Sequence, residues 1–265
     1  MDGMKGTFGS ALLCMTALGV LTAASAAQSP FDGTWKTNMA QAKFSPKPNV
    51  FYISQGWYHC VSCNPAFDAK ADGTDQAVSG LSYDSISVKE VDPNTIAVVA
   101  KKGGKVDFEQ TRTVSADGKQ LIVKTTSHAM NSDQIVTAEA TAKRVGIKPS
   151  GVHATSGQWE ISKVSQSENG LLTTYKTNGD EITMTTPTGE SFTAKFDGQD
   201  YPVKGTYGYD AVSLKKLDDH TIEETDKRGG KIVEVTKMTV TGKTMKIESA
   251  NKLTDRTNTF VATKQ

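Results

Sequence analysis

Two cysteines and a neighbouring histidine are the side chains of this chain with the clearest potential for chemistry. They lie in the segment His59-Cys60-Val61-Ser62-Cys63. A Cys-x-x-Cys spacing can close a local disulfide, act as a redox dithiol or contribute two ligands to a metal site. The sequence favours a disulfide between Cys60 and Cys63, because the third cysteine, Cys14, lies in a segment that we expect to be removed on export.

The redox and metal alternatives stay open, but each needs a feature that the sequence does not supply. A redox dithiol needs a thiolate of low pKa, usually obtained from a helix N-terminus, and the surrounding sequence is rich in strand signals. Tetrahedral zinc needs four ligands, or three and a water molecule, and no second pair of ligands follows His59, Cys60 and Cys63 nearby in sequence. We therefore predict no metal and no cofactor.

The other polar residues do not form a catalytic pattern. The sequence has no nucleophile elbow, no zinc-protease motif and no phosphate-binding loop. Three histidines occur in turn-like or linker sequence, where we expect them at the surface: His128, His153 and His220. Four aspartates sit in turns, where Asp accepts hydrogen bonds from its own backbone: Asp72, Asp197, Asp218 and Asp219. We predict no catalytic residues and no enzymatic activity.

The strands and turns that carry these residues belong to an internal duplication. Matching segments recur at nearly constant offsets: 124 residues from Trp35 to Trp159, 125 from Asp72 to Asp197, and 126 from Gly103 to Gly229. Two long copies indicate a pair of domains, because a solenoid needs at least about three shorter units. We predict a signal peptide at 1–27, a first repeat at 28–145, a linker at 146–155 and a second repeat at 156–265.

Both copies have the sequence pattern of antiparallel strands. Apolar residues alternate with polar ones, as in Ile86 and Val88 or Val212 and Leu214. Asp-Gly and Gly-Gly turns separate these runs at close spacing and supply the positive φ of tight hairpins. About eight strands in each copy suffice to close a small barrel. The sequence thus predicts an all-β protein of two tandem antiparallel meanders that form barrels, or alternatively one combined β unit.

The N-terminus is typical of a secretory signal. Lys5 precedes a short apolar stretch at 11–21, and Ala and Ser offer a cleavage site near 24–27. The stretch is shorter than the ~20 residues of a membrane span. The net charge of +1 gives no basic surface for nucleic acid or for an anionic membrane. We expect a periplasmic or secreted protein that neither binds nucleic acid nor spans a membrane.

The start of each copy resembles the opening of lipocalins and other calycins. That opening is a Gly-x-Trp on the first strand, as in Gly33-Thr34-Trp35 and Gly157-Gln158-Trp159. Calycins often place a late Arg across this Trp. Arg144 stands at that place in the first copy, whereas the second copy has Lys264. We expect both tryptophans to be core plugs.

The mature chain is also similar to a group of bacterial exported proteins of unknown function. They share the Asp-Gly-Thr-Trp at 32–35, the Lys-Phe-Ser-Pro at 43–46 and a Cys-x-Ser-Cys ahead of a Lys-x-Asp-Gly turn, as at 60–63 and 70–73. This resemblance covers nearly everything after the signal and implies no activity.

These patterns predict an exported, non-enzymatic protein that binds a small apolar or amphipathic ligand. The calycin-like opening and a strand count that leaves room for one small ligand favour this function. The alternative is a structural or interaction protein of the cell envelope, with an exposed aromatic patch near Trp57 and Tyr58. We expect Trp57 and Tyr58 to cover the Cys60–Cys63 turn and not to form such a patch. A third hypothesis is a thiol or metal function at Cys60 and Cys63.

Overall fold

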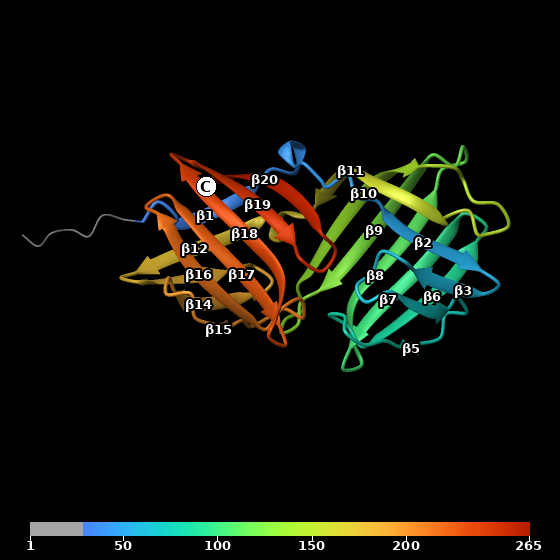
Figure 1. Ribbon diagram of the computed structural model, residues 1–265, viewed down its shortest axis with the longest axis horizontal. Helices are drawn as coiled ribbons and strands as arrows, with labels where there is room; N and C mark the ends of the chain where they lie inside the picture. Colours follow the sequence, from blue (N-terminus) through green and yellow to red (C-terminus); the bar gives the residue numbers. More distant parts are fainter. Residues whose placement is uncertain (1–28) are drawn as a thin grey trace, which may run out of the picture.

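The computed structural model describes residues 29–265, so the predicted signal peptide lies outside the described residues. The described chain forms two ten-stranded antiparallel sheets, each curled into a nearly closed barrel (Figure 1). The predicted all-β class with two barrels is confirmed. Each sheet has ten strands where about eight were expected, because two-residue strands such as β5 (Gln76–Ala77) add to the count.

The first barrel consists of β2 to β11. Its hydrogen-bonded order is β4 (Phe67–Lys70), β3 (Trp57–Cys60), β2 (Asn49–Ser54), β11 (Gly157–Gln166), β10 (Ile135–Val145), β9 (Gln120–His128), β8 (Lys105–Val114), β7 (Thr95–Lys102), β6 (Ser85–Asp92) and β5.

The second barrel consists of β1 and β12 to β20. Its order is β14 (Ser191–Lys195), β13 (Glu181–Thr185), β12 (Leu172–Asn178), β1 (Gly33–Thr37), β20 (Arg256–Lys264), β19 (Thr244–Asn251), β18 (Lys231–Thr241), β17 (Thr221–Arg228), β16 (Ala211–Asp218) and β15 (Tyr201–Pro202). Two short 3-10 turns complete the chain, η1 (Met39–Gln41) and η2 (Glu168–Gly170).

The first strands of the two sequence copies are exchanged between the barrels. β1 pairs with β12 and β20 in the second barrel, whereas β11 pairs with β10 and β2 in the first. In Figure 1 the blue β1 lies among the orange and red strands, and β11 lies with the green ones. Both strands carry the same Gly-x-Trp pattern and occupy equivalent places in the two barrels, β1 between β12 and β20 and β11 between β2 and β10.

The predicted ranges 28–145 and 156–265 therefore do not coincide with the barrels. The segment 146–155, predicted as a linker between domains, lies within the first barrel, because β10 and β11 on either side of it are paired neighbours. The chain passes between the barrels at 38–48, after β1, and at 167–171, after β11.

Two Asp-Gly turns help to close the barrels. The Gly73 N–H donates to the Val88 carbonyl at 2.8 Å, and the Gly198 N–H donates to the Leu214 carbonyl at 2.9 Å. Both glycines have positive φ, +85° and +74°, a region that L side chains rarely adopt. The Asp-Gly turn after β4 thus bonds to β6, and the Asp-Gly turn after β14 bonds to β16. These contacts join the two ends of each sheet and reduce its exposed edge.

The tryptophan of each exchanged strand is buried in the core of its barrel, as predicted. Trp35 and Trp159 are each 1% exposed, and their indole N–H groups donate to the carbonyls of Phe31 and Thr155. The Arg144 guanidinium lies 4.0 Å from the Trp159 ring, and the Lys264 ammonium lies 5.6 Å from the Trp35 ring. Because of the exchange, Arg144 covers the tryptophan of the second copy and not that of its own.

Candidate functional site

A cavity of about 480 Å³ opens in the first barrel and is the candidate ligand site. This volume lies in the usual range for sites that bind small molecules. Its wall is mainly apolar, with six aromatic side chains: Phe51, Tyr58, Phe67, Tyr83, Phe108 and Trp159. Phe51, Tyr58 and Phe108 lie on β2, β3 and β8, where the alternation of strand residues turns every second side chain inward.

A single arginine, Arg112, lies inside this wall. Its Nη1 donates to the Tyr58 hydroxyl at 3.0 Å, and its Nε and Nη2 donate to the Gln110 side-chain oxygen at 3.0 and 2.7 Å. The guanidinium carbon lies 5.0 Å from the centre of the Phe51 ring. Arg112 forms no ion pair with a residue of 29–265, so its positive charge is held by neutral groups and aromatic faces.

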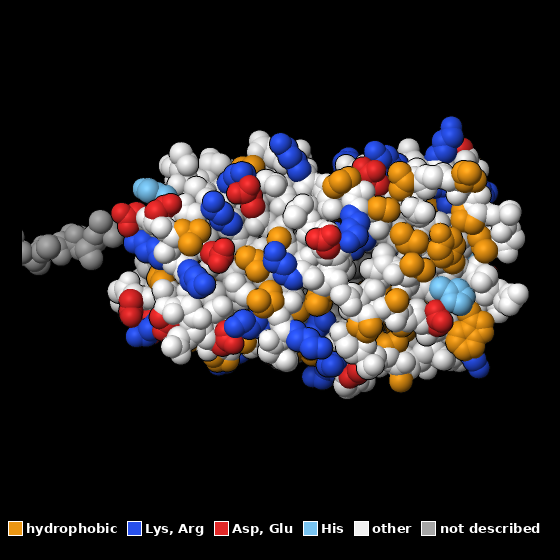
Figure 2. All heavy atoms as spheres, viewed as in Figure 1, with side chains coloured by type: hydrophobic (Ala, Val, Ile, Leu, Met, Phe, Trp, Pro, Cys, Tyr) orange, Lys and Arg blue, Asp and Glu red, His pale blue; other side chains and the backbone are white. Residues whose placement is uncertain are grey.

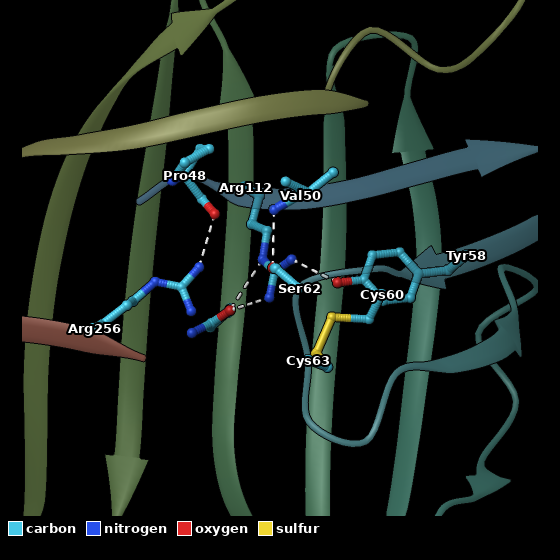
Figure 3. Close-up of a disulfide and its surroundings, with 9 residues drawn as sticks. Pro48, Val50, Tyr58, Cys60, Ser62, Cys63, Arg112 and Arg256 are labelled. Carbon is cyan, nitrogen blue, oxygen red and sulfur yellow. Dashed lines mark hydrogen bonds between the residues drawn. A yellow bond between two sulfur atoms is a disulfide. The ribbon is translucent and has the colours of Figure 1, made fainter. Parts of the chain in front are cut away.

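The second barrel supplies two further arginines at the mouth of the cavity. Arg256 donates from Nη2 to the Pro48 carbonyl at 2.7 Å, and Arg228 donates from Nη2 to the Gly80 carbonyl at 3.2 Å. The side chain of Asn64 also donates to the Leu253 carbonyl across the same junction. In Figure 3, Arg256 reaches from its red strand toward the region of Arg112 and the disulfide. Within the described chain no Asp or Glu lines this cavity.

The disulfide between Cys60 and Cys63 forms part of the same wall. The two Cα atoms lie 5.4 Å apart, and both residues line the cavity. Ser62, between them, accepts a hydrogen bond from the Val50 N–H at 2.9 Å, which ties the disulfide loop to β2 (Figure 3). This loop follows β3 directly, so it positions the inward-facing end of that strand.

His59 does not join the two cysteines. Its Nδ1 lies 2.7 Å from an Asp68 carboxylate oxygen on the outer face, whereas Cys60 points inward. Neighbouring residues of a strand face opposite sides, and for this reason the sequence-adjacent donors separate. Among residues 29–265 no group of three His, Cys, Asp or Glu side chains could hold a metal ion.

The structure corrects the predicted role of Tyr58. Sequence reasoning paired Tyr58 with Trp57 as a cap over the cysteine turn. Tyr58 instead lies in the barrel interior at 2% exposure, and Trp57, one residue away, points outward at 42% exposure. Burial raises the pKa of Tyr83, which also lines the cavity, to about 12.

The four aspartates that the sequence places in turns were expected to accept hydrogen bonds from nearby backbone N–H groups. Three of them accept a hydrogen bond from the N–H two residues on: Asp72 from Thr74, Asp197 from Gln199, and Asp218 from His220. Asp219 instead pairs with Lys216, with 2.7 Å between nitrogen and oxygen.

The predicted histidine positions hold only in part. His220 is exposed, as expected. His153 is partly buried and contacts the Asp92 carbonyl and the Thr155 hydroxyl, at 2.8 and 2.9 Å. His128 is also partly buried, contrary to the prediction of a surface residue, because it ends β9 at the junction between the barrels.

Sequence reasoning missed Arg112, the residue on which the chemistry of this cavity depends. A comparison of the two copies contains a signal for it. At the same register the first copy has Arg112 opposite Ile96, and the second copy has Met238 opposite Ile222. A charge at an inward strand position in only one of two copies indicates a function that the shared fold does not require.

Comparison with known proteins finds no matching family model, no matching curated protein and no matching solved structure. Within residues 29–265 no helix combines the length and the apolar character that a membrane-spanning helix requires. The function must therefore be argued from the cavity itself.

The disulfide offers a direct test of its role. Replacing Cys60 and Cys63 by serine is expected to lower the free energy of unfolding by about 2 kcal/mol, since the closed loop is short. Urea denaturation of the variant and of the reduced wild-type protein would measure this loss. A loss of ligand or metal content without a change in stability would contradict a structural role.

Proposed function

We propose that the first barrel binds a small amphipathic anion. The apolar part of this ligand packs among the aromatic side chains. Its anionic group pairs with the Arg112 guanidinium, which forms no ion pair with a residue of 29–265. The observation that carries this proposal is a partly buried guanidinium in an aromatic-lined cavity that no acidic side chain of residues 29–265 lines. A buried charge is costly unless it is paired, so an anionic ligand supplies a missing partner.

The arginines at the mouth support the same ligand class. Arg228 and Arg256 add positive charge where a ligand enters; Arg228 is held by a carbonyl of the first barrel and Arg256 by one of the crossing segment 38–48. A cavity lined by charge of one sign attracts ligands of the opposite sign. The ligand site thus uses residues of both barrels, which gives the duplication a functional reason.

Decanoate is a suitable probe, and decanol is its neutral counterpart. We expect calorimetric titration to show saturable binding of decanoate, and Arg112→Met to weaken it about 10- to 100-fold, because a hydrogen bond to a charged group is lost. Methionine is the residue at the matching position of the second barrel. Decanol binding should change little.

Lys124→Met is the matched control, since Lys124 lies on the neighbouring strand with an exposed side chain. It should leave decanoate binding unchanged. Equal weakening by the two substitutions, or no saturable binding of either probe, would remove the proposal.

We propose further that the protein acts after export, in the periplasm or outside the cell, as a non-enzymatic lipocalin/calycin-like carrier. Support comes from the signal-like sequence before residue 28 and from the disulfide, which suits an oxidising compartment.

The alternative role in envelope interactions rests on exposed apolar side chains. Figure 2 shows hydrophobic side chains gathered over the first barrel, on the right, and charges of both signs interspersed over the second. Trp57 and Val61 are among the exposed apolar residues. Burial of Tyr58 removes one of the two side chains on which this alternative was based, so we favour ligand binding.

A further inference from the structure

The interiors of the two barrels carry charged side chains of opposite sign, at different positions. Three inward positions that are apolar in the first barrel are acidic in the second: Val98 corresponds to Glu224, Ala100 to Asp226 and Phe108 to Glu234. The position of Arg112 is taken by Met238. At these four positions the second barrel therefore has three carboxylates and no cation.

Two of these three carboxylates are buried and incompletely bonded. Glu224 is 8% exposed and Asp226 is 5% exposed. One oxygen of each, Glu224 Oε2 and Asp226 Oδ1, has no hydrogen-bond partner among residues 29–265. Asp226 lies directly across from Glu234 on β18, whose carboxylate accepts from the Ser249 hydroxyl at 2.8 Å. Buried polar groups are normally paired, so these oxygens require an explanation.

A cavity of about 410 Å³ leads to Glu224 from the junction of the barrels. Its wall includes a second acidic residue, Glu190, which accepts a hydrogen bond from the Tyr209 hydroxyl. Tyr175, Tyr209 and Met184 supply aromatic and thioether surface beside the carboxylates. No Lys, Arg or His of the described residues lines this cavity, so its carboxyl groups have no cationic partner there.

We propose that this cavity in the second barrel binds a small organic cation, a protonated amine, at Glu224 and Glu190. The ammonium group pairs with the carboxylate of Glu224, and the aliphatic part of the amine packs against Tyr175, Tyr209 and Met184. Aromatic faces attract organic cations, which suits the two tyrosines. This site is independent of the anion site in the first barrel.

The geometry favours an organic cation over a metal ion. Among the described residues no three acidic, histidine or cysteine side chains converge closely enough to hold a metal. Calcium and magnesium need six or more oxygen ligands at short distance. A cavity of this size also leaves room for several carbon atoms beyond a single charged group.

Hexylammonium chloride is the probe that tests the site. Calorimetric titration of the mature chain at pH 8 is expected to give saturable one-to-one binding. Glu224→Gln keeps the shape of the side chain and removes its charge, so it should weaken binding about tenfold or more. Glu190→Gln, on another element of the same wall, should weaken binding in the same direction.

The matched control is Glu223→Gln, because Glu223 is adjacent on β17 and faces the outside. This control and Arg112→Met should leave hexylammonium binding unchanged. The proposal is overturned if hexylammonium shows no saturable binding, if Glu223→Gln weakens it as much as Glu224→Gln, or if calcium chloride occupies a Glu224-dependent site that hexylammonium does not reach.

Discussion

Replacing Glu224 by valine and Asp226 by alanine is expected to make the protein markedly more stable at pH 8. These are the residues at the matching positions of the first barrel, Val98 and Ala100, so the barrel can accommodate them. Burial raises the pKa of Asp226 from 3.8 to about 7, which corresponds to a cost on the order of 4 kcal/mol when the carboxylate is charged. Removing the charges removes that cost.

The sign of the pH dependence follows from the direction of these pKa shifts. Burial and the neighbouring Asp226 also raise the pKa of Glu224, and the carboxylates of Glu190 and Glu234 face the pair from other elements. Between about pH 4 and pH 7 the folded state binds protons that the unfolded state has released. The contribution of Asp226 to wild-type stability therefore falls as pH rises through this window.

Urea denaturation at pH 5 and pH 8 would measure the effect, and the gain of the double variant should be larger at pH 8. Hydrogen bonds lower the pKa of exposed aspartates such as Asp72 and Asp197. These aspartates affect the wild-type protein and the variant equally, so their contribution cancels in the difference between the two free energies of unfolding. Glu223→Val on the outer face is the control. An equal gain at both pH values would indicate better packing and contradict the electrostatic explanation.

Replacing Trp159 by alanine is expected to lower the free energy of unfolding by about 3–5 kcal/mol. Trp159 is almost fully buried and lies against the Arg144 guanidinium, so the substitution leaves a cavity in the core of the first barrel. Because the first strands are exchanged, the loosened region should be 49–166, although Trp159 belongs to the second copy of the sequence.

Hydrogen exchange followed by mass spectrometry would locate the loosened region. Trp35→Ala provides the reciprocal variant, since Trp35 lies in β1 and should loosen 172–264. If Trp159→Ala instead increased exchange mainly in 172–264, each copy would have retained its own first strand and the exchange would be disproved.

Local sequence signals were enough for the class and the internal symmetry of this protein. Alternating apolar residues predict strands because a strand has a period of two, and Asp-Gly turns predict hairpins because they need positive φ. The near-constant offsets of Trp, Asp-Gly and Gly-Gly positions predict two similar units. The two barrels are confirmed, and the tryptophans and turn aspartates lie where these signals place them.

The partner of each strand was decided only by the tertiary structure. Gly33-Thr34-Trp35 and Gly157-Gln158-Trp159 are nearly interchangeable as sequences, so no local signal states which barrel each one completes. In the folded chain the crossings at 38–48 and 167–171 carry it from one barrel to the other.

The candidate sites likewise depend on which face of a strand a residue occupies. His59 and Cys60 are neighbours in sequence but lie on opposite faces, whereas Arg112 and Tyr58, distant in sequence, meet across the barrel. Strand type and turns are properties of a few consecutive residues, and the sequence determines them. Cavities and the charges inside them are shared by strands far apart in the chain, and only the closed sheets bring those strands together.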